Sequence, residues 1–316
     1  MRYHEHIGRL CPHGIMFHHF HDESRFYRSE GSISAADFQS LIDYVGRENI
    51  LSPQDWEQRA AHGTLSATHV CFTFDDSLRC QFEIALPVLN RNGIKAFFFV
   101  YSSVFEGCVE RLETFRYLRN ACYPSLEDFY SDFYEQAAQY DLARTIEEGL
   151  KDFPGEEYLA DFPFYTLGDR KYRFVRDRIL TTAHYNQIVD GLMSKKLLDL
   201  GKIAPLLWMG ADDLRELTHQ GHVVGLHSYS HPMNMSGLSP AEQEKEYSEN
   251  FTHLQRELEV SPWAMSHPRN SYNADTIGVL RKLGIRVGFC ANLKYPGRQG
   301  LEFPREDHST IFKEVR

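Results

Sequence analysis

The chain has 316 residues, of which 42% are hydrophobic and 25% are charged, as expected for a protein with a packed core. Its net charge of −10 argues against a general nucleic-acid-binding protein, which would carry a basic face. No run of about 18 apolar residues is present, so we expect no membrane span. The first residues lack the apolar region of a secretory signal, and the six cysteines include no CxxC motif. We therefore expect a cytoplasmic protein with free thiols.

Helix starts are marked by capping residues at two places. Ser34 with Asp37 resembles a capping box before the helical segment FQSLIDYV. Ser239, Pro240 and Glu242 supply the N-cap, N1 and N3 residues of a second, longer helix.

Several predicted helices end at a glycine that is followed at once by a short apolar run. Such helices are predicted at residues 81–92, 212–220 and 274–283, and the glycines after them are Gly93, Gly221 and Gly284. Glycine is a common stop signal after a helix, and short apolar runs are typical of strands covered on both faces. The repeated pattern predicts an α/β fold with a mostly parallel sheet or barrel.

Residues 103–205 interrupt this alternation. The segment is rich in Tyr, Phe, Asp and Glu, and its pattern is mainly helical and irregular. It is too long and too aromatic for a linker, so we interpret it as an insertion or cap packed over one end of the barrel. The alternative is a disordered acidic segment, which the many aromatic residues disfavour.

Polar side chains follow two of the predicted strands. Asp75 and Asp76 come directly after VCFTF, and His227 and His231 follow HVVGL. Functional residues of parallel α/β folds gather at the C-terminal ends of the strands, so we expect these four side chains to lie together.

This set of residues is typical of a catalytic metal site. Neutral imidazoles suit zinc and its neighbours, and one carboxylate would complete three protein ligands. Three ligands leave a position open for water, whose pKa falls toward neutrality on the metal. A second carboxylate can then take the proton of that water. One aspartate would therefore bind the metal and the other would act as the base.

Each motif also has a simpler explanation. Paired aspartates after a strand often belong to a turn or a helix cap, and HxxxH is common among sixteen histidines. His18, His19 and His21 follow the N-terminal apolar run and are interpreted as strand and loop residues, with His19 as a candidate substrate contact. The occurrence of both motifs at predicted strand ends favours the metal site.

The two motifs resemble those of the polysaccharide deacetylase family (carbohydrate esterase family 4, NodB-like). TFDDS, followed by a helix and IKAFFFV, is similar to the family's TFDDG motif and the strand after it, and GHVVGLHSYSH is similar to its H-[ST]-x-x-H motif. The resemblance covers about residues 12–102 and 206–308. It implies one irregular (β/α) barrel domain over residues 1–316, with a mainly helical insertion at about 103–205.

The resemblance also implies roles for individual residues. Asp75 matches the base of the family, and Asp76, His227 and His231 match its metal ligands. Ser228 matches the hydroxyl residue that supports the second motif. The cofactor is expected to be one divalent metal ion, zinc first, with cobalt, nickel, iron and manganese as alternatives.

The third motif departs from the family pattern. The family often has R-x-P-Y, whose arginine holds the base; here Pro268 aligns with the proline, so Ser266 falls at the arginine position. Arg269 is a candidate for the missing positive charge, and the backbone N–H after Pro268 is a candidate for stabilising the oxyanion. Ser77 stands where the family usually has glycine.

The end of the chain differs as well, because the late Leu-x-His motif of the family is absent. In its place the chain has FPREDHSTIF, where His308 is our candidate general acid. Arg305 and Asp307 are candidates for orienting His308 or the base.

Together these features predict a metal-dependent hydrolase that removes an acetyl group, first of all an N-acetyl group, from a carbohydrate or sugar precursor. A cytoplasmic enzyme would meet a small N-acetylated compound or an oligosaccharide, as in surface polysaccharide biosynthesis. Two alternatives stay open: an inactive barrel that binds carbohydrate or a partner, and a hydrolase of a non-sugar amide. The sequence does not indicate the oligomeric state.

Overall fold

A computed structural model describes Tyr3 and residues 11–22, 24–108, 110–160, 165–295 and 297–315. The chain divides into two compact units. The first comprises Met1–Glu110 and Ala204–Arg316, and the second comprises Arg111–Ile203. The first unit carries the sheet, and the second is built from helices.

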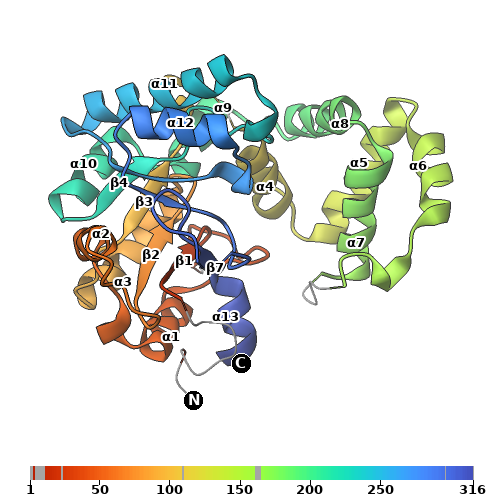
Figure 1. Ribbon diagram of the computed structural model, residues 1–316. Coiled ribbons are helices and arrows are strands. Elements are labelled where there is room, and N and C mark those ends of the chain that lie inside the picture. The colour runs from red at the N-terminus through yellow and green to blue at the C-terminus, as the bar shows by residue number, and fades with distance from the viewer. Residues whose placement is uncertain are drawn as a thin grey trace. The chain divides into compact units, whose positions relative to one another are not determined.

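The first unit is organised around a seven-stranded sheet in which all neighbouring strands are parallel (Figure 1). The strands are β1 (His13–Phe17), β2 (Val70–Phe74), β3 (Phe97–Val100), β4 (Val223–Leu226), β5 (Ala264–Ser266), β6 (Val287–Phe289) and β7 (Arg305–Asp307). Their order is β6-β5-β4-β3-β2-β1-β7. An isolated bridge joins Phe289 in β6 to Phe303, two residues before β7, so the sheet nearly closes into a barrel. The predicted irregular α/β barrel is confirmed.

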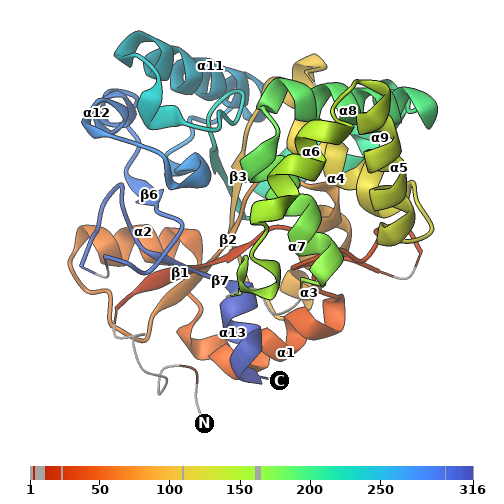
Figure 2. The same cartoon turned by 90° about the vertical axis from the view of Figure 1, so that its right-hand side faces the viewer.

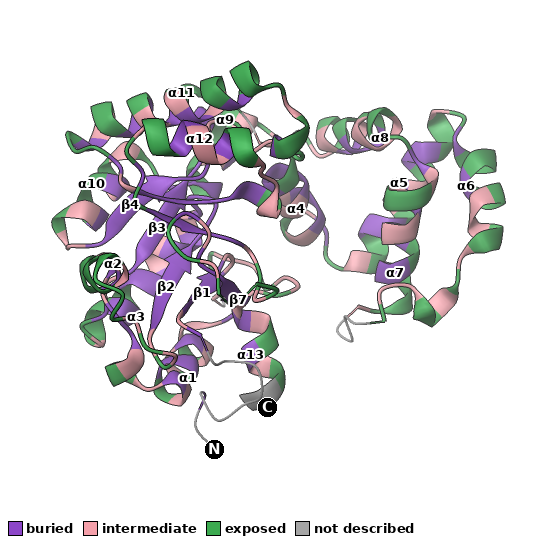
Figure 3. Ribbon diagram, viewed as in Figure 1, coloured by how far each residue is buried: buried purple, intermediate pink, exposed green. Residues whose placement is uncertain are grey.

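Helices surround this sheet in the first unit (Figure 1). They are α1 (Ala35–Val45), α2 (Pro53–Ala61), α3 (Leu86–Arg91), α10 (Ala211–His219), α11 (Pro240–Leu258), α12 (Ala274–Lys282) and α13 (His308–Val315). Every residue of β1 to β6 is buried (Figure 3). Strands covered on both faces in this way explain the unbroken apolar runs in the sequence.

The helix boundaries agree with the predicted start and stop signals. Ser34 and Ser239 both form capping boxes, at the starts of α1 and α11. Gly93, Gly221 and Gly284 have φ angles of 60°, 86° and 78°, so each ends its helix in the left-handed region. The predicted helix at 81–92 begins as a π-helical turn, Gln81–Ala85, before α3.

The second unit is helical and has a core of its own. Its helices, labelled in Figure 2, are α4 (Arg111–Ala121), α5 (Leu126–Gln139), α6 (Ala143–Gly149), α7 (Leu167–Phe174) and α8 (Thr182–Lys195). Helix α9 (Leu200–Leu207) spans the boundary between the units. Phe129, Phe133 and Tyr172 lie at the centre of this core, where their rings pack against one another. The aromatic residues that argue against disorder therefore form a packed cluster.

Three further observations concern the cysteines, the possibility of a membrane span, and a cavity. The six cysteines are free. Among the described helices, none combines the length and the apolar character that crossing a bilayer requires. A cavity of about 700 Å³ lies along α5 and α8 in the second unit, with Gln136 and Tyr140 in its lining, and it contains none of the predicted site residues.

Candidate metal centre and its surroundings

The two aspartates follow β2 in a turn of unusual backbone conformation. Asp76 and Ser77 have φ angles of 77° and 59°, a region that residues other than glycine seldom adopt. The turn is held by Asp75 N, which donates to Phe17 O at 3.1 Å, and by Gln81 Nε2, which donates to Asp75 O at 2.6 Å. Such conformations persist where neighbouring contacts fix them, and they cluster at functional sites.

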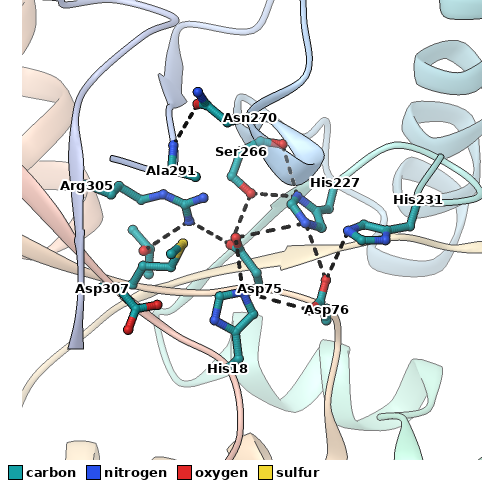
Figure 4. Close-up of polar contacts among 12 residues, drawn as sticks. His18, Asp75, Asp76, His227, His231, Ser266, Asn270, Ala291, Arg305 and Asp307 are labelled. Atoms are coloured by element: carbon teal, nitrogen blue, oxygen red, sulfur yellow. Dashed lines mark hydrogen bonds and ion pairs between the residues drawn. The ribbon is translucent and has the colours of Figure 1, made fainter. Parts of the chain in front are cut away.

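Asp76, His227 and His231 form a cluster suited to a metal ion (Figure 4). One potential ligand atom from each residue lies within 4.8 Å of the others. Asp76 Oδ1 is 3.4 Å from His227 Nε2 and 3.5 Å from His231 Nε2. This oxygen is buried and accepts no hydrogen bond of regular geometry from a described residue. A buried carboxylate oxygen facing two imidazole nitrogens is a donor set that fits a divalent transition metal.

The surroundings of His227 orient its ring for this role. His227 Nδ1 lies 3.0 Å from Ser266 O and 2.7 Å from Ser266 Oγ. A carbonyl oxygen can only accept a hydrogen bond, so Nδ1 carries the proton and Nε2 keeps a lone pair toward Asp76. Metal-binding histidines commonly donate their other N–H to a carbonyl or carboxylate in this way.

The ionisation of the cluster follows from burial and from charge. Burial lowers the pKa of His231 to about 4, so its imidazole is neutral at pH 7. Burial opposes the ionisation of Asp76, but the neighbouring His231 and His227 hold its pKa well below the ordinary value. Burial also opposes the charging of His227, yet Asp75 and Asp76 raise its pKa. A divalent ion would therefore take the place of a proton on His227.

Asp75 is held by a buried arginine from the far end of the chain. Arg305 Nη1 donates to Asp75 Oδ1 at 2.8 Å, and Ser266 Oγ donates to the same oxygen at 3.0 Å (Figure 4). Arg305 is fully buried, and its Nε donates to Cys290 O at 2.7 Å. Burial would raise the pKa of Asp75, but the guanidinium of Arg305, followed by His227, lowers it below the ordinary value. Asp75 Oδ2 is left to face His227 and His18.

The third-motif residues lie in a short turn after β5. Pro268 is buried there, and Arg269 and Asn270 have φ angles of 52° and 57°. Arg269 is exposed, and the ion pair with Asp75 is formed by Arg305. The positive charge missing from position 266 is therefore supplied by β7, and the candidacy of Arg269 for this charge was wrong.

His308 is not placed to act as a general acid. Its side chain is buried, its Nδ1 lies 3.1 Å from Met16 O, and its Nε2 lies 2.9 Å from Gly31 O. Both ring nitrogens are thus occupied by backbone carbonyl oxygens, and the ring stacks on Phe17. This geometry contradicts the prediction that His308 donates a proton to the leaving group.

A different histidine faces the two carboxylates. His18 Nε2 lies 4.0 Å from Asp75 Oδ2 and 3.9 Å from Asp76 Oδ2, and the side chain is 29% exposed. From the sequence, His18 is expected to be a strand or loop residue, and its neighbour His19 is the candidate substrate contact. The position of His18 in the sheet explains why it faces the carboxylates. Phe17 pairs with Phe74, so His18 follows β1 at the level where Asp75 follows β2.

The remaining predicted residues lie at the ends of β4 and β7. Ser228, with a φ of 64°, accepts a hydrogen bond from His231 N at 3.1 Å. Asp307 Oδ1 accepts from Ser309 N at 2.8 Å, and His308 Nδ1 is 3.7 Å away. Burial opposes the ionisation of Asp307, while His308 and His18 contribute to a pKa below the ordinary value.

The sequence was compared with family profiles and with curated proteins. Residues 182–288, which include both histidines of the cluster, match the sequence profile of the polysaccharide deacetylases. No curated protein matches the chain.

Solved structures resemble the chain over nearly its whole length. The deacetylase PplD of Streptococcus pyogenes in complex with acetate has 15% identity and a TM-score of 0.53, covering 94% of this chain and 92% of that one. IcaB from Ammonifex degensii has 16% identity and a TM-score of 0.53, covering 94% and 91%. A de-N-acetylase from Aggregatibacter actinomycetemcomitans has 14% identity and a TM-score of 0.53, covering 96% and 98%. At these identities the likeness shows a shared fold.

Proposed function

We propose, from the premise that the chain belongs to the polysaccharide deacetylase family, that it is a metal-dependent hydrolase of N-acetylated carbohydrates or sugar precursors. The observation that carries the proposal is the buried cluster of Asp76, His227 and His231 beside Asp75. Structural ion pairs also bury carboxylates. Most buried polar atoms of that kind are hydrogen-bonded. Asp76 Oδ1 instead faces two imidazoles and accepts no regular hydrogen bond from a described residue.

Asp76 Oδ1 and the Nε2 atoms of His227 and His231 would hold one divalent ion, with zinc as the first candidate. When bound, the ion would supply Lewis-acid polarisation of the acetyl carbonyl and would lower the pKa of the attacking water. Cobalt, nickel, iron and manganese are the alternatives that the same nitrogen and oxygen ligands accept.

Asp75 is the proposed general base. Its Oδ1 is fixed by Arg305 and Ser266, which leaves Oδ2 to take the proton of the attacking water. Because Arg305 lowers the pKa of Asp75, the carboxylate is ionised and ready to accept that proton at neutral pH.

His18 is the proposed general acid. An amide nitrogen must be protonated before it can leave, so the site needs a proton donor facing the base. His18 Nε2 lies about as far from Asp75 Oδ2 as from Asp76 Oδ2, and its partial exposure lets substrate reach it. His308 is buried against backbone carbonyl oxygens and is not assigned this role.

The substrate class follows from the family and from the neighbours. One neighbour is described as a de-N-acetylase and another as a deacetylase in complex with acetate, which supports an N-acetyl substrate. We further propose that the protein is cytoplasmic and acts on a small sugar precursor or oligosaccharide, as in surface polysaccharide biosynthesis. The inactive-barrel alternative rests on the missing third-motif arginine and the altered late motif; the ion pair of Arg305 with Asp75 supports the active enzyme on the first of these grounds.

The test is acetate release by the purified, metal-loaded protein. The panel contains N-acetylated sugar nucleotides, N-acetylglucosamine oligomers and, as a separate class, N-acetylated amino acids. We expect acetate and one free amine per turnover from at least one sugar. Turnover of the non-sugar amides alone would select the amide-hydrolase alternative. A protein that binds metal and hydrolyses nothing in either class would be the inactive barrel.

A further inference from the structure

The loop from His227 to His231, which carries two candidate metal ligands, has a strained backbone. Ser228 and His231 have φ angles of 64° and 54°, in the left-handed region that residues with a Cβ seldom adopt. A loop of this kind keeps one conformation only where the surrounding contacts determine it. The groups that supply these contacts therefore decide where the two imidazoles lie.

One carboxylate from α11 binds the middle of the loop. Glu246 Oε2 accepts hydrogen bonds from Tyr229 N at 3.1 Å and from Ser230 N at 2.9 Å. Its other oxygen, Oε1, accepts from Ser230 Oγ at 2.6 Å. Hydrogen bonds to an ionised acceptor are the stronger kind, and one anion here satisfies two successive backbone amides.

One side-chain amide from α11 binds the start of the loop. Asn250 is fully buried, and its Oδ1 accepts from His227 N at 3.1 Å, an N–H that it shares with Val100 O, also at 3.1 Å. Its Nδ2 donates to Val100 O at 3.0 Å and to Ser102 Oγ at 2.9 Å. If the amide of Asn250 were flipped, its NH₂ group would face the N–H of His227, and two donors would meet. The hydrogen-bond network therefore determines the orientation of the amide. Asn250 thus ties the ends of β3 and β4 to each other at the candidate site.

These two residues act from one face of one helix. Glu246 and Asn250 are four positions apart in α11, so their side chains point the same way. Asn250 accepts from the backbone N–H of residue 227, and Glu246 accepts from those of residues 229 and 230. Ser228 Oγ accepts from the backbone N–H of residue 231. Mid-helix asparagine is usually unfavourable, and its complete burial here is explained by these contacts.

We propose that Glu246 and Asn250 are positioning residues that preorganise His227 and His231 for metal binding. The proposal rests on the metal site of the proposed function and is independent of the substrate. Groups that orient metal ligands typically change metal affinity by about 10–100-fold when they are removed. We expect Glu246→Ala and Asn250→Ala to weaken Co²⁺ and Zn²⁺ binding by about that factor.

Glu246→Gln is the conservative partner of Glu246→Ala. Its carbonyl oxygen can still accept from Tyr229 N and Ser230 N, whereas the charge is lost, so an intermediate affinity is expected. Glu244→Ala is the matched control. Glu244 is exposed on the same helix and contacts Lys282 at 3.9 Å, so its removal changes the charge of α11 without touching the loop.

The experiment uses the full chain, stripped of metal by a chelator and titrated with Co²⁺ against a competing chelator. The dissociation constant and the visible absorption spectrum of bound Co²⁺ are the readouts, and neither depends on catalysis. Thermal unfolding of the metal-free proteins is measured in parallel. A purely structural role would lower the unfolding temperature and leave the affinity and spectrum of the folded protein as in wild type.

Weaker binding and an altered spectrum in Glu246→Ala, with partial recovery in Glu246→Gln and none of this in Glu244→Ala, would support the proposal. Wild-type affinity and spectrum in folded Glu246→Ala and Asn250→Ala would overturn it. If Asn250→Ala does not fold, the three variants at 246 and 244 decide the question. A wild-type protein that binds neither ion would overturn the metal site as well. Normal metal binding without acetate release would count against the proposed function alone.

Discussion

Arg305 and Asp75 form a buried ion pair between residues that are 230 positions apart. Their Nη1 and Oδ1 atoms are 2.8 Å apart, and the two side chains are 0% and 3% exposed. The two residues come from β7 and from the end of β2, with β1 between these strands in the sheet. Gly14 of β1 lies beneath the arginine, because a Cβ there would come within 3.0 Å of Arg305 Cγ. The glycine therefore makes room for the aliphatic part of Arg305, whose guanidinium supplies the charge that the third motif lacks.

Removal of Arg305 should lower both stability and activity. Arg305→Gln would leave the buried carboxylate of Asp75 without its guanidinium partner, and breaking a buried pair in this way typically costs about 3–5 kcal/mol. Chemical denaturation at pH 7 measures this difference in the free energy of unfolding. Arg269→Gln is the control, since this arginine is exposed and is expected to change the free energy by less than about 0.5 kcal/mol.

The same substitution should have a defined pH signature. The folded pKa of Asp75 is lowered, so its stabilising contribution is present above the unfolded value of 3.8 and is lost as pH falls through the lower folded value. Without Arg305 that pKa rises, and the acidic limb of the pH–rate profile should move to higher pH. Arg305→Lys, which keeps a charge, should shift it less. An unchanged profile in Arg305→Gln would contradict the pairing.

Substitution of Asp75 by asparagine should remove the base and keep the metal. Asparagine has nearly the same volume, but it cannot accept a proton, and loss of a general base typically lowers kcat by about 10²–10⁴-fold. Elemental analysis should find as much divalent metal as in wild type, whereas Asp76→Asn should lose metal as well as activity. Retention of most of the activity in Asp75→Asn would show that another group takes the proton.

Local signals in the sequence were sufficient to predict the alternation of strands and helices. Buried strands and left-handed glycines depend on a few neighbouring residues, so the stops at Gly93, Gly221 and Gly284 could be found from the sequence. Asp76 follows β2 and the two histidines follow β4, with β3 between these strands. Their meeting at one edge of the sheet follows from the rule for parallel sheets. By contrast, β7 consists of only three residues, Arg305, Glu306 and Asp307, so no apolar run marks it as a strand.

The rest of the site depends on tertiary register. His18 reaches the carboxylates because Phe17 pairs with Phe74, and a shift of one residue would turn His19 toward them instead. His308 matched the expected position of a late histidine, but its ring packs on Phe17 and bonds backbone carbonyls of β1 and its following loop. The contacts of Glu246 and Asn250 depend on the packing of α11 against β4, which no local pattern indicates.

Substitution of His18 should impair chemistry more than binding. In His18→Gln the amide leaving group loses its proton donor, so kcat should fall by about 10²–10⁴-fold for an N-acetyl substrate. An activated aryl acetate, whose leaving group needs no protonation, should be hydrolysed at a rate much closer to that of wild type. His21→Gln is the control, because His21 bonds Ser32 Oγ at 2.8 Å. Equal losses on both substrates in His18→Gln would contradict the general-acid assignment.

Buried neutral histidines outside the candidate metal ligands should make the protein sensitive to mild acid. Burial lowers the pKa of His222 to about 4 and that of His267 to about 3. Below the unfolded value of 6.5 the unfolded chain binds more protons than the folded chain, so the free energy of unfolding should fall as pH decreases from 6.5 toward 4.

His222 allows this effect to be tested on one residue. Its Nδ1 accepts from Ala96 N at 3.1 Å, and its Nε2 is buried without a partner among the described residues, so protonation would add a buried charge. His222→Gln cannot be protonated, and its free energy of unfolding should fall less steeply between pH 6.5 and 4, by up to about 1.4 kcal/mol per pH unit. Urea denaturation at pH 7 and pH 5 for both proteins measures the difference. Parallel pH dependences would show that His222 titrates alike in the folded and unfolded chains, and would locate the acid sensitivity elsewhere.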